Sequence, residues 1–166
     1  MAHFEVHDDR RILKFEGEEI GFSSSEKPGS GRWIEFTLYK TAGDGQYVLS
    51  RVGVSNVYHT PECRVAKGRI EPAPWGALGP DAVPCYRVPG ATGGCRPDPS
   101  EFPMVCPEED RTWARAYRTT AALMDALMKE DEDGNHYMTA VARRLVQEAA
   151  ARDPELVGAY QVETIT

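Results

Sequence analysis

The sequence predicts an α+β protein, in which an antiparallel sheet carries a C-terminal helical hairpin on one face. Three observations support this class. Apolar and polar side chains alternate with period two over much of residues 11–58, as in half-buried strands. From residue 107 to 153, apolar side chains recur every three or four positions, as in amphipathic helices. Between them, residues 59–106 have no periodicity and contain all four cysteines, which predicts an irregular insert ordered by a cross-link.

The length of 166 residues fits a single domain, residues 1–166. With 41% hydrophobic and 27% charged residues, the composition is that of a globular chain and excludes a wholly disordered one. No apolar run approaches the roughly 20 residues of a membrane span, and the first residues are too polar for a signal peptide. We therefore expect a cytoplasmic protein without membrane contact. Its predicted parts are a β-rich segment (1–58), the insert (59–106), the helical hairpin (107–153) and a tail or edge strand (154–166).

Two hairpins are expected in the β-rich segment. A weak one occupies residues 11–22 and turns near Gly17. A stronger one joins Arg32–Lys40 to Gln46–Val54 through the loop Thr41–Gly45, whose glycines tolerate positive φ. These strands supply the predicted sheet.

The register of the stronger hairpin determines which side chains face the core. A five-residue loop places Leu38 opposite Val48 on the core face. A bulge in the loop would shift this register by one residue and exchange the faces. In the unshifted register, the opposite face carries aromatic and Arg side chains, which are residue types that often anchor interfaces. The predicted partner-binding residues are Trp33, Tyr39, Tyr47 and Arg51.

Two helices are predicted after the insert. The first begins at Pro107, with Glu108–Asp110 near the positive end of its dipole. The second begins at Asn135 as N-cap and ends at Asp153–Pro154. The β-branched residues within Ala159–Ile165 predict a short final strand.

Three chemistries compete for the cysteines. They are thiolate ligands of a structural zinc ion, two disulfides, or reduced thiols buried as small hydrophobes. Zinc would order an insert in which 15 of 48 residues are Pro or Gly. Successive cysteines are separated by 21, 9 and 10 residues, so no C-x2-C pair supports the metal. We favour zinc, and the predicted ligands are Cys63, Cys85, Cys95 and Cys106, with His59 as a substitute for one of them.

No nucleotide loop, paired-carboxylate motif or triad pattern is present, so the sequence favours a protein that is not an enzyme. The first hypothesis is a zinc-stabilised accessory protein that binds a macromolecular partner, which we expect to be a protein. The second is a zinc-dependent hydrolase or nuclease, and a Cys63–His59 nucleophile is a further enzymatic possibility.

The uneven charge allows two other partner hypotheses. The net charge is −7, but residues 51–97 hold 6 basic residues against 3 acidic ones, which could bind nucleic acid. A weaker hypothesis is a DNA mimic that inhibits a DNA-binding protein through its acidic side chains. The basic residues are Arg51, Arg64, Lys67, Arg69, Arg87 and Arg96, and the acidic ones are Glu101, Glu108, Glu109, Asp110 and Glu130–Asp133.

Overall fold

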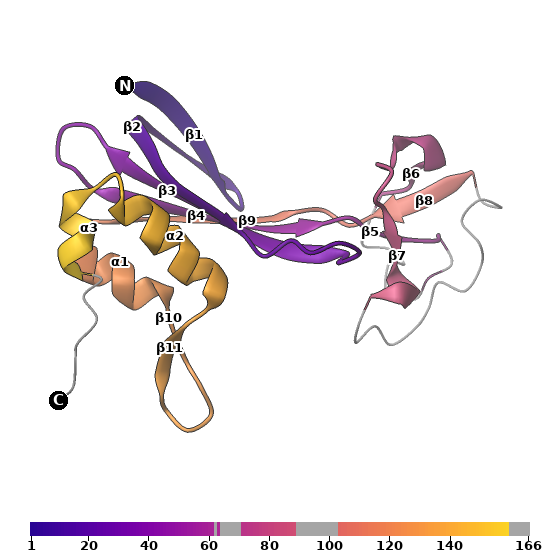
Figure 1. Ribbon diagram of the computed structural model, residues 1–166. Coiled ribbons are helices and arrows are strands. Elements are labelled where there is room, and N and C mark those ends of the chain that lie inside the picture. Colours follow the sequence, from indigo (N-terminus) through magenta and orange to yellow (C-terminus); the bar gives the residue numbers. More distant parts are fainter. Residues whose placement is uncertain (62, 64–70, 89–102, 160–166) are drawn as a thin grey trace. The chain divides into compact units, whose positions relative to one another are not determined.

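In the computed structural model, a mostly antiparallel sheet is combined with short helices, as the α+β class requires (Figure 1). The structure describes residues 1–61, 63, 71–88 and 103–159. These residues form two compact units. The sheet unit contains Met1–Ser25, Glu35–Val52 and the described residues from Thr112 onward, and the cysteine unit contains Glu26–Ile34 and the described part of Gly53–Arg111.

The described elements alternate short strands with a few helical turns. In chain order they are β1 (Ala2–Asp8), β2 (Arg11–Ser24), β3 (Arg32–Thr41), β4 (Tyr47–Ser55), β5 (Val57–His59), β6 (Ala73–Pro74), η1 (Trp75–Ala77), β7 (Val83–Pro84), η2 (Cys85–Arg87), β8 (Met104–Pro107), β9 (Arg111–Tyr117), α1 (Thr120–Leu127), β10 (Met128–Glu130), β11 (His136–Met138), α2 (Ala140–Ala150) and α3 (Pro154–Ala159). β3, β4 and β9 each contribute residues to both units, so the units do not coincide with the predicted parts of the chain. The single domain remains a prediction.

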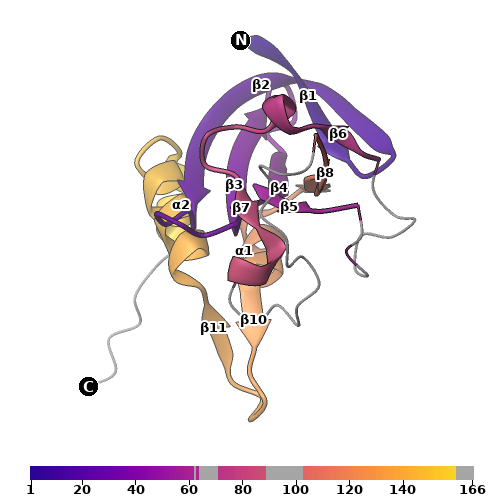
Figure 2. The same cartoon turned by 90° about the vertical axis from the view of Figure 1, so that its right-hand side faces the viewer.

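The sheet unit contains five strands in the order β1-β2-β3-β4-β9. β1 and β2 pair along their whole common length, from Ala2 opposite Gly17 to Asp8 opposite Arg11, and bend together as one curved ribbon (Figures 1 and 2). The turn between them contains Asp9 with a φ of 51°, a conformation that Asp adopts more readily than most residues. The predicted turn near Gly17 is therefore wrong, because β2 continues through it and residues 2–8 supply the missing strand.

A glycine is needed at position 17 because β3 approaches the backbone closely there, and not because the chain turns. A Cβ atom at this position would collide with the backbone carbonyl of Lys40 on β3. We expect Gly17→Ala to lower the free energy of unfolding by about 1–3 kcal/mol, the usual range for overpacking. Gly53→Ala is the control, because its Cβ would lie 3.7 Å from the nearest atom. Urea denaturation measures both variants, and equal effects would contradict the steric explanation.

The turn between β1 and β2 also contacts β9, the other outer strand. Asp9 N–H donates to the Thr112 carbonyl at 3.1 Å, and the Ala114 N–H donates to the Asp8 carboxylate at 3.1 Å. Asp8 is 7% exposed and also accepts from Arg11 and Arg115. Hydrogen bonds from Arg11 and Ala114 hold the pKa of Asp8 below its usual value. One carboxylate thus connects both outer strands at this end of the sheet.

The helices of the sheet unit cover one sheet face. Gly21 permits a close approach of α2, since a Cβ atom there would lie 3.1 Å from the Leu145 carbonyl and 3.2 Å from the Ala149 side chain of that helix. Burial of apolar side chains between the strands and the helices is the main stabilising force of the sheet unit. The buried core consists of Ile20, Leu38, Tyr47 and Leu49 from the strands and Leu123, Leu127, Ala142, Leu145, Val146, Ala149 and Leu156 from the helices.

The predicted facing of β3 and β4 is wrong by one residue. Leu38 shares the helix-covered core with Tyr47 and Leu49, whereas Val48 lies outside that core. The loop explains the shift, because Thr41 N–H donates to the Gln46 carbonyl at 2.8 Å. Gly43 and Gly45, with φ values of 81° and 63°, allow this compact loop. Tyr47 therefore faces the core.

The helix predicted from Pro107 is also wrong in its first half, where β9 forms. Trp113 and Tyr117 are four residues apart, a spacing that fits one face of a strand as well as one face of a helix. Both pack against the helix-covered core from β9. α1 begins only after Thr119, whose hydroxyl accepts the Ala122 N–H at 3.1 Å.

The second helix is confirmed in α2, but it begins later than predicted. Thr139, not Asn135, is its N-cap. The two-stranded ribbon β10–β11 separates α1 from α2 and projects beyond them (Figures 1 and 2), so the two helices are not joined by a simple turn. Pro154 begins α3, where a tail or strand was predicted, and residues 160–166 lie outside the described part. None of the helices in the described segments is long and apolar enough to cross a bilayer.

The cysteine unit contains a four-stranded sheet in the order β6-β8-β5-β7. β5 is antiparallel to β8, with His59 opposite Cys106, and parallel to β7, with Val57 opposite Val83. Its small core consists of Val57, Cys63, Cys85 and Cys106, against which Val88 packs. Within the described part of the chain, cysteines thus outnumber aliphatic side chains in this core.

Candidate metal centre

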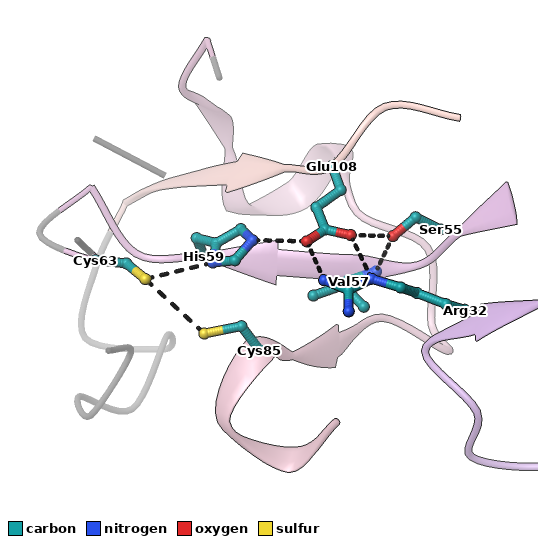
Figure 3. A network of polar contacts seen from close by, with 7 residues as sticks. All are labelled: Arg32, Ser55, Val57, His59, Cys63, Cys85 and Glu108. Atoms are coloured by element: carbon teal, nitrogen blue, oxygen red, sulfur yellow. Dashed lines mark hydrogen bonds and ion pairs between the residues drawn. The ribbon is translucent and has the colours of Figure 1, made fainter. Parts of the chain in front are cut away.

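Three of the predicted ligands converge in the cysteine unit. The donor atoms of His59, Cys63 and Cys85 all lie within 4.8 Å of one another. Cys63 Sγ is 3.4 Å from His59 Nδ1 and 3.9 Å from Cys85 Sγ (Figure 3). This buried group could hold a metal ion.

Short local structures bring these donors together. His59 is the last residue of β5, and the chain then turns so that the Cys63 N–H donates to the Thr60 carbonyl at 2.9 Å. Cys85 begins η2 directly after β7, and Val88 N–H closes that turn on the Cys85 carbonyl at 3.2 Å. Because β5 and β7 are parallel, the turns that follow them lie at the same end of the two strands. The H-x3-C spacing in the sequence therefore corresponds to one turn after a strand.

Burial and donor chemistry both suit a structural metal. His59, Cys63 and Cys85 are 2%, 0% and 6% exposed. Two sulfur atoms and an imidazole nitrogen are ligands that tetrahedral zinc accepts. Structural zinc sites are closed, whereas catalytic ones keep an open position for water or substrate. The geometry therefore favours a structural centre.

Of the other two predicted cysteine ligands, Cys106 is among the described residues and Cys95 is not. Cys106 is 3% exposed and packs in the same apolar core, but it is outside the group of three converging donors. Burial, together with the nearby Cys63, raises the pKa of the Cys106 thiol. Cys95 lies outside the described residues. Cys95 and Cys106 therefore remain the predicted candidates for a further ligand.

Glu108 supports the centre from the side opposite the sulfur atoms. Its Oε1 lies 2.9 Å from His59 Nε2, and its two oxygens also accept hydrogen bonds from Arg32 and Ser55 (Figure 3). Burial alone would raise its pKa, but hydrogen bonds from Arg32, Ser55 and His59 lower the pKa of Glu108 to about 2. The sequence assigned Glu108 to a helix N-terminus. Its contact with His59, 49 residues away, depends on the pairing of β5 with β8.

The line Cys63–His59–Glu108 also resembles the order of a nucleophile, a base and an orienting carboxylate. A nucleophilic thiol must reach its substrate, however, and Cys63 is completely buried while His59 is 2% exposed. The burial that suits a structural metal therefore disfavours nucleophilic catalysis.

The predicted partner-binding residues do not form one exposed face. Tyr47 is 1% exposed, and its hydroxyl donates to Asp153 at 2.6 Å, so its predicted exposure is wrong. The cause is the one-residue shift of β4 described above. Tyr39 is half-buried beside Phe4, with ring centroids 4.7 Å apart. Trp33 is also half-buried and Arg51 is exposed, and partner binding by these three residues remains a prediction.

Other aromatic side chains are more exposed than the predicted ones. Trp75 and Tyr86 in the cysteine unit are 38% and 40% exposed, and Met104 is 37% exposed. Arg87, from the predicted basic segment, lies over the Tyr86 ring at 5.8 Å. The other basic residues of that segment, Arg64, Lys67, Arg69 and Arg96, lie outside the described residues.

The sequence matches no protein-family model, and no curated protein or solved structure is detectably similar to it. Any functional conclusion must therefore come from the site itself. The strongest observation there is a buried set of histidine and cysteine donors with a carboxylate behind the histidine.

Proposed function

We propose that the protein is a small zinc-stabilised binding protein that acts through a protein partner and not through catalysis. The burial of His59, Cys63 and Cys85 carries this proposal, since a closed site suits a structural zinc ion. Within the described residues, the core around the cysteines is small, so metal ligation would add to the few apolar contacts seen there. Cys95 or Cys106 completes the tetrahedron.

Metal analysis of the purified protein tests the structural half of the proposal. We expect about one equivalent of zinc, and replacement by Co²⁺ should give the absorption of a tetrahedral, thiolate-bound ion. Comparison of Cys95→Ser with Cys106→Ser identifies the fourth ligand, because only loss of a ligand changes the Co²⁺ spectrum. A protein without bound metal contradicts the proposal. Three protein ligands with an exchangeable water would instead favour the zinc-dependent hydrolase.

Exposed aromatic residues of the cysteine unit support the binding half of the proposal. Trp75 is held edge-on against Tyr58, with ring centroids 5.2 Å apart, yet remains 38% exposed. Rigid aromatic and Arg side chains are the commonest anchors of protein interfaces. Trp75, Tyr86 and Arg87 are therefore the proposed partner contacts.

We expect Trp75→Ala and Tyr86→Ala each to weaken partner binding at least about tenfold, the loss typical of an interface anchor. Ile12→Ala is the control, because Ile12 is an apolar residue that is at least as exposed, at 47%, but belongs to the sheet unit. Affinity capture from the native host followed by titration of the isolated partner measures the effect. A complex that is lost steeply with salt would favour a nucleic acid over a protein.

A further inference from the structure

We infer that Glu108 is a positioning residue of the metal centre, which holds the His59 ring so that Nδ1 is the ligand atom; this inference rests on the zinc site proposed above. It concerns a residue that is not itself a ligand. The relevant groups are Arg32, Ser55, Val57, His59 and Glu108 (Figure 3).

The two ring nitrogens of His59 face different groups. Nε2 lies 2.9 Å from Glu108 Oε1, whereas Nδ1 lies 3.4 Å from Cys63 Sγ. A carboxylate that is paired with Arg32 accepts hydrogen bonds, so Nε2 is the ring nitrogen that donates to Glu108. Nδ1 then keeps its lone pair and directs it toward the two sulfur atoms. Such a carboxylate–histidine pair is the usual means of fixing the tautomer of a histidine that binds metal.

The carboxylate is itself fixed by donors from other strands. Arg32 binds both of its oxygens, with Nε 2.9 Å from Oε2 and Nη2 2.5 Å from Oε1. The Ser55 hydroxyl donates to Oε2 at 2.7 Å. This bidentate pairing with a planar guanidinium restricts the orientation of the carboxylate more than a single hydrogen bond would.

The backbone of Glu108 is hydrogen-bonded to β5, the strand that contains His59. Its N–H donates to the Val57 carbonyl at 2.9 Å, and the Val57 N–H in turn donates to the Ser55 hydroxyl oxygen at 3.2 Å. Both the main chain and the side chain of Glu108 are therefore held relative to β5, which ends at His59. A ring held in this way loses less conformational entropy when it binds a metal.

Zinc affinities of the wild type and two variants test the inference. We expect Glu108→Ala to bind zinc 10–100-fold more weakly, measured by competition with a chelator. Glu108→Gln keeps an acceptor for Nε2–H but loses the charge that pairs with Arg32. Its zinc affinity should therefore lie between those of the wild type and Glu108→Ala. Glu109→Ala is the matched control, since Glu109 is the adjacent carboxylate and is exposed. The Co²⁺ spectrum should be the same in all four proteins, because the ligands are unchanged.

Nitrogen-15 NMR of the zinc-loaded protein separates positioning from a general loss of stability. In the wild type we expect His59 to be protonated at Nε2, with a slowly exchanging proton, and metal-bound at Nδ1. In Glu108→Ala that proton should exchange rapidly. If the wild type takes up no zinc, the proposed function and this inference both fail. If the wild type binds zinc but Glu108→Ala binds it equally well, or His59 is protonated at Nδ1, this inference alone fails.

Discussion

Removal of the proposed zinc ion by a chelator is expected to unfold the cysteine unit while the helices of the sheet unit remain folded. Structural zinc contributes about 10–16 kcal/mol in small zinc-dependent domains, and that energy is folding energy. Among the described residues, the core around the cysteines has Val57 and Val88 as its aliphatic members, too few to replace the proposed metal. Cys63→Ala should have the same effect as the chelator.

Amide hydrogen exchange measures this prediction residue by residue. The ladder amides of β5 and β8 should lose their protection when zinc is removed, and those of α2 should keep it. α2 serves as the internal control because it packs on a separate core. Unchanged protection of β5 and β8 in the metal-free protein would show that the metal has no structural role.

Replacing Asp153 with Ala is expected to lower the free energy of unfolding by about 3 kcal/mol, a typical loss when one partner of a buried ion pair is removed. Asp153 is 3% exposed and accepts hydrogen bonds from Lys40 at 2.9 Å and from the buried Tyr47 hydroxyl at 2.6 Å. Its carboxylate also accepts the Glu155 N–H at 3.2 Å and so caps α3, which Pro154 then begins. The substitution would leave the Lys40 ammonium and the Tyr47 hydroxyl with only the longer contacts to the exposed Glu155, at 3.6 and 3.5 Å, and would leave α3 uncapped.

Glu155→Ala is the control for this variant. Glu155 also faces Lys40, at 3.6 Å, but its side chain is 69% exposed, so its removal should cost less than about 1 kcal/mol. Urea denaturation measures both variants. Similar losses for the two would show that the burial of Asp153 contributes nothing.

The same carboxylate predicts a pH dependence of stability. Burial opposes ionisation, but hydrogen bonds from Tyr47 and Lys40 hold the pKa of Asp153 below its usual value. A lowered folded-state pKa stabilises the protein above the unfolded-state value and loses that contribution as the pH falls through the folded-state value. Stability should therefore decrease below about pH 4, and less steeply in Asp153→Asn.

Local periodicity was sufficient for some elements and not for others. β3, β4 and α2 were predicted because their apolar spacing fits one period only. The segment around β9 was assigned to a helix, because Trp113 and Tyr117 fit both periods and Glu108–Asp110 resemble a helix start. Pairing with β4 decides in favour of a strand, and that pairing is a long-range property.

The candidate metal centre was also predicted only in part. The three converging donors, His59, Cys63 and Cys85, were among the five ligands predicted from sequence, His59 only as a substitute, but the sequence did not single them out. Glu108 and Arg32 could not be predicted, because their contacts depend on the register of β5 with β8 and on the position where β3 begins. Tyr47 was misplaced for a related reason, since a loop conformation set by two glycines shifts its face.

Asp8 protects the sheet against pairing with other molecules. β1 and β9 are its outer strands, and an outer strand with unpaired N–H and C=O groups can act as a template for aggregation. Where the turn after β1 meets β9, the N–H groups of Asp9 and Ala114 already have acceptors within the chain. Arg11 and Arg115 add charge beside the same carboxylate, which further discourages the docking of a foreign strand. A carboxylate that organises a turn thus also serves as a barrier to edge-to-edge self-association.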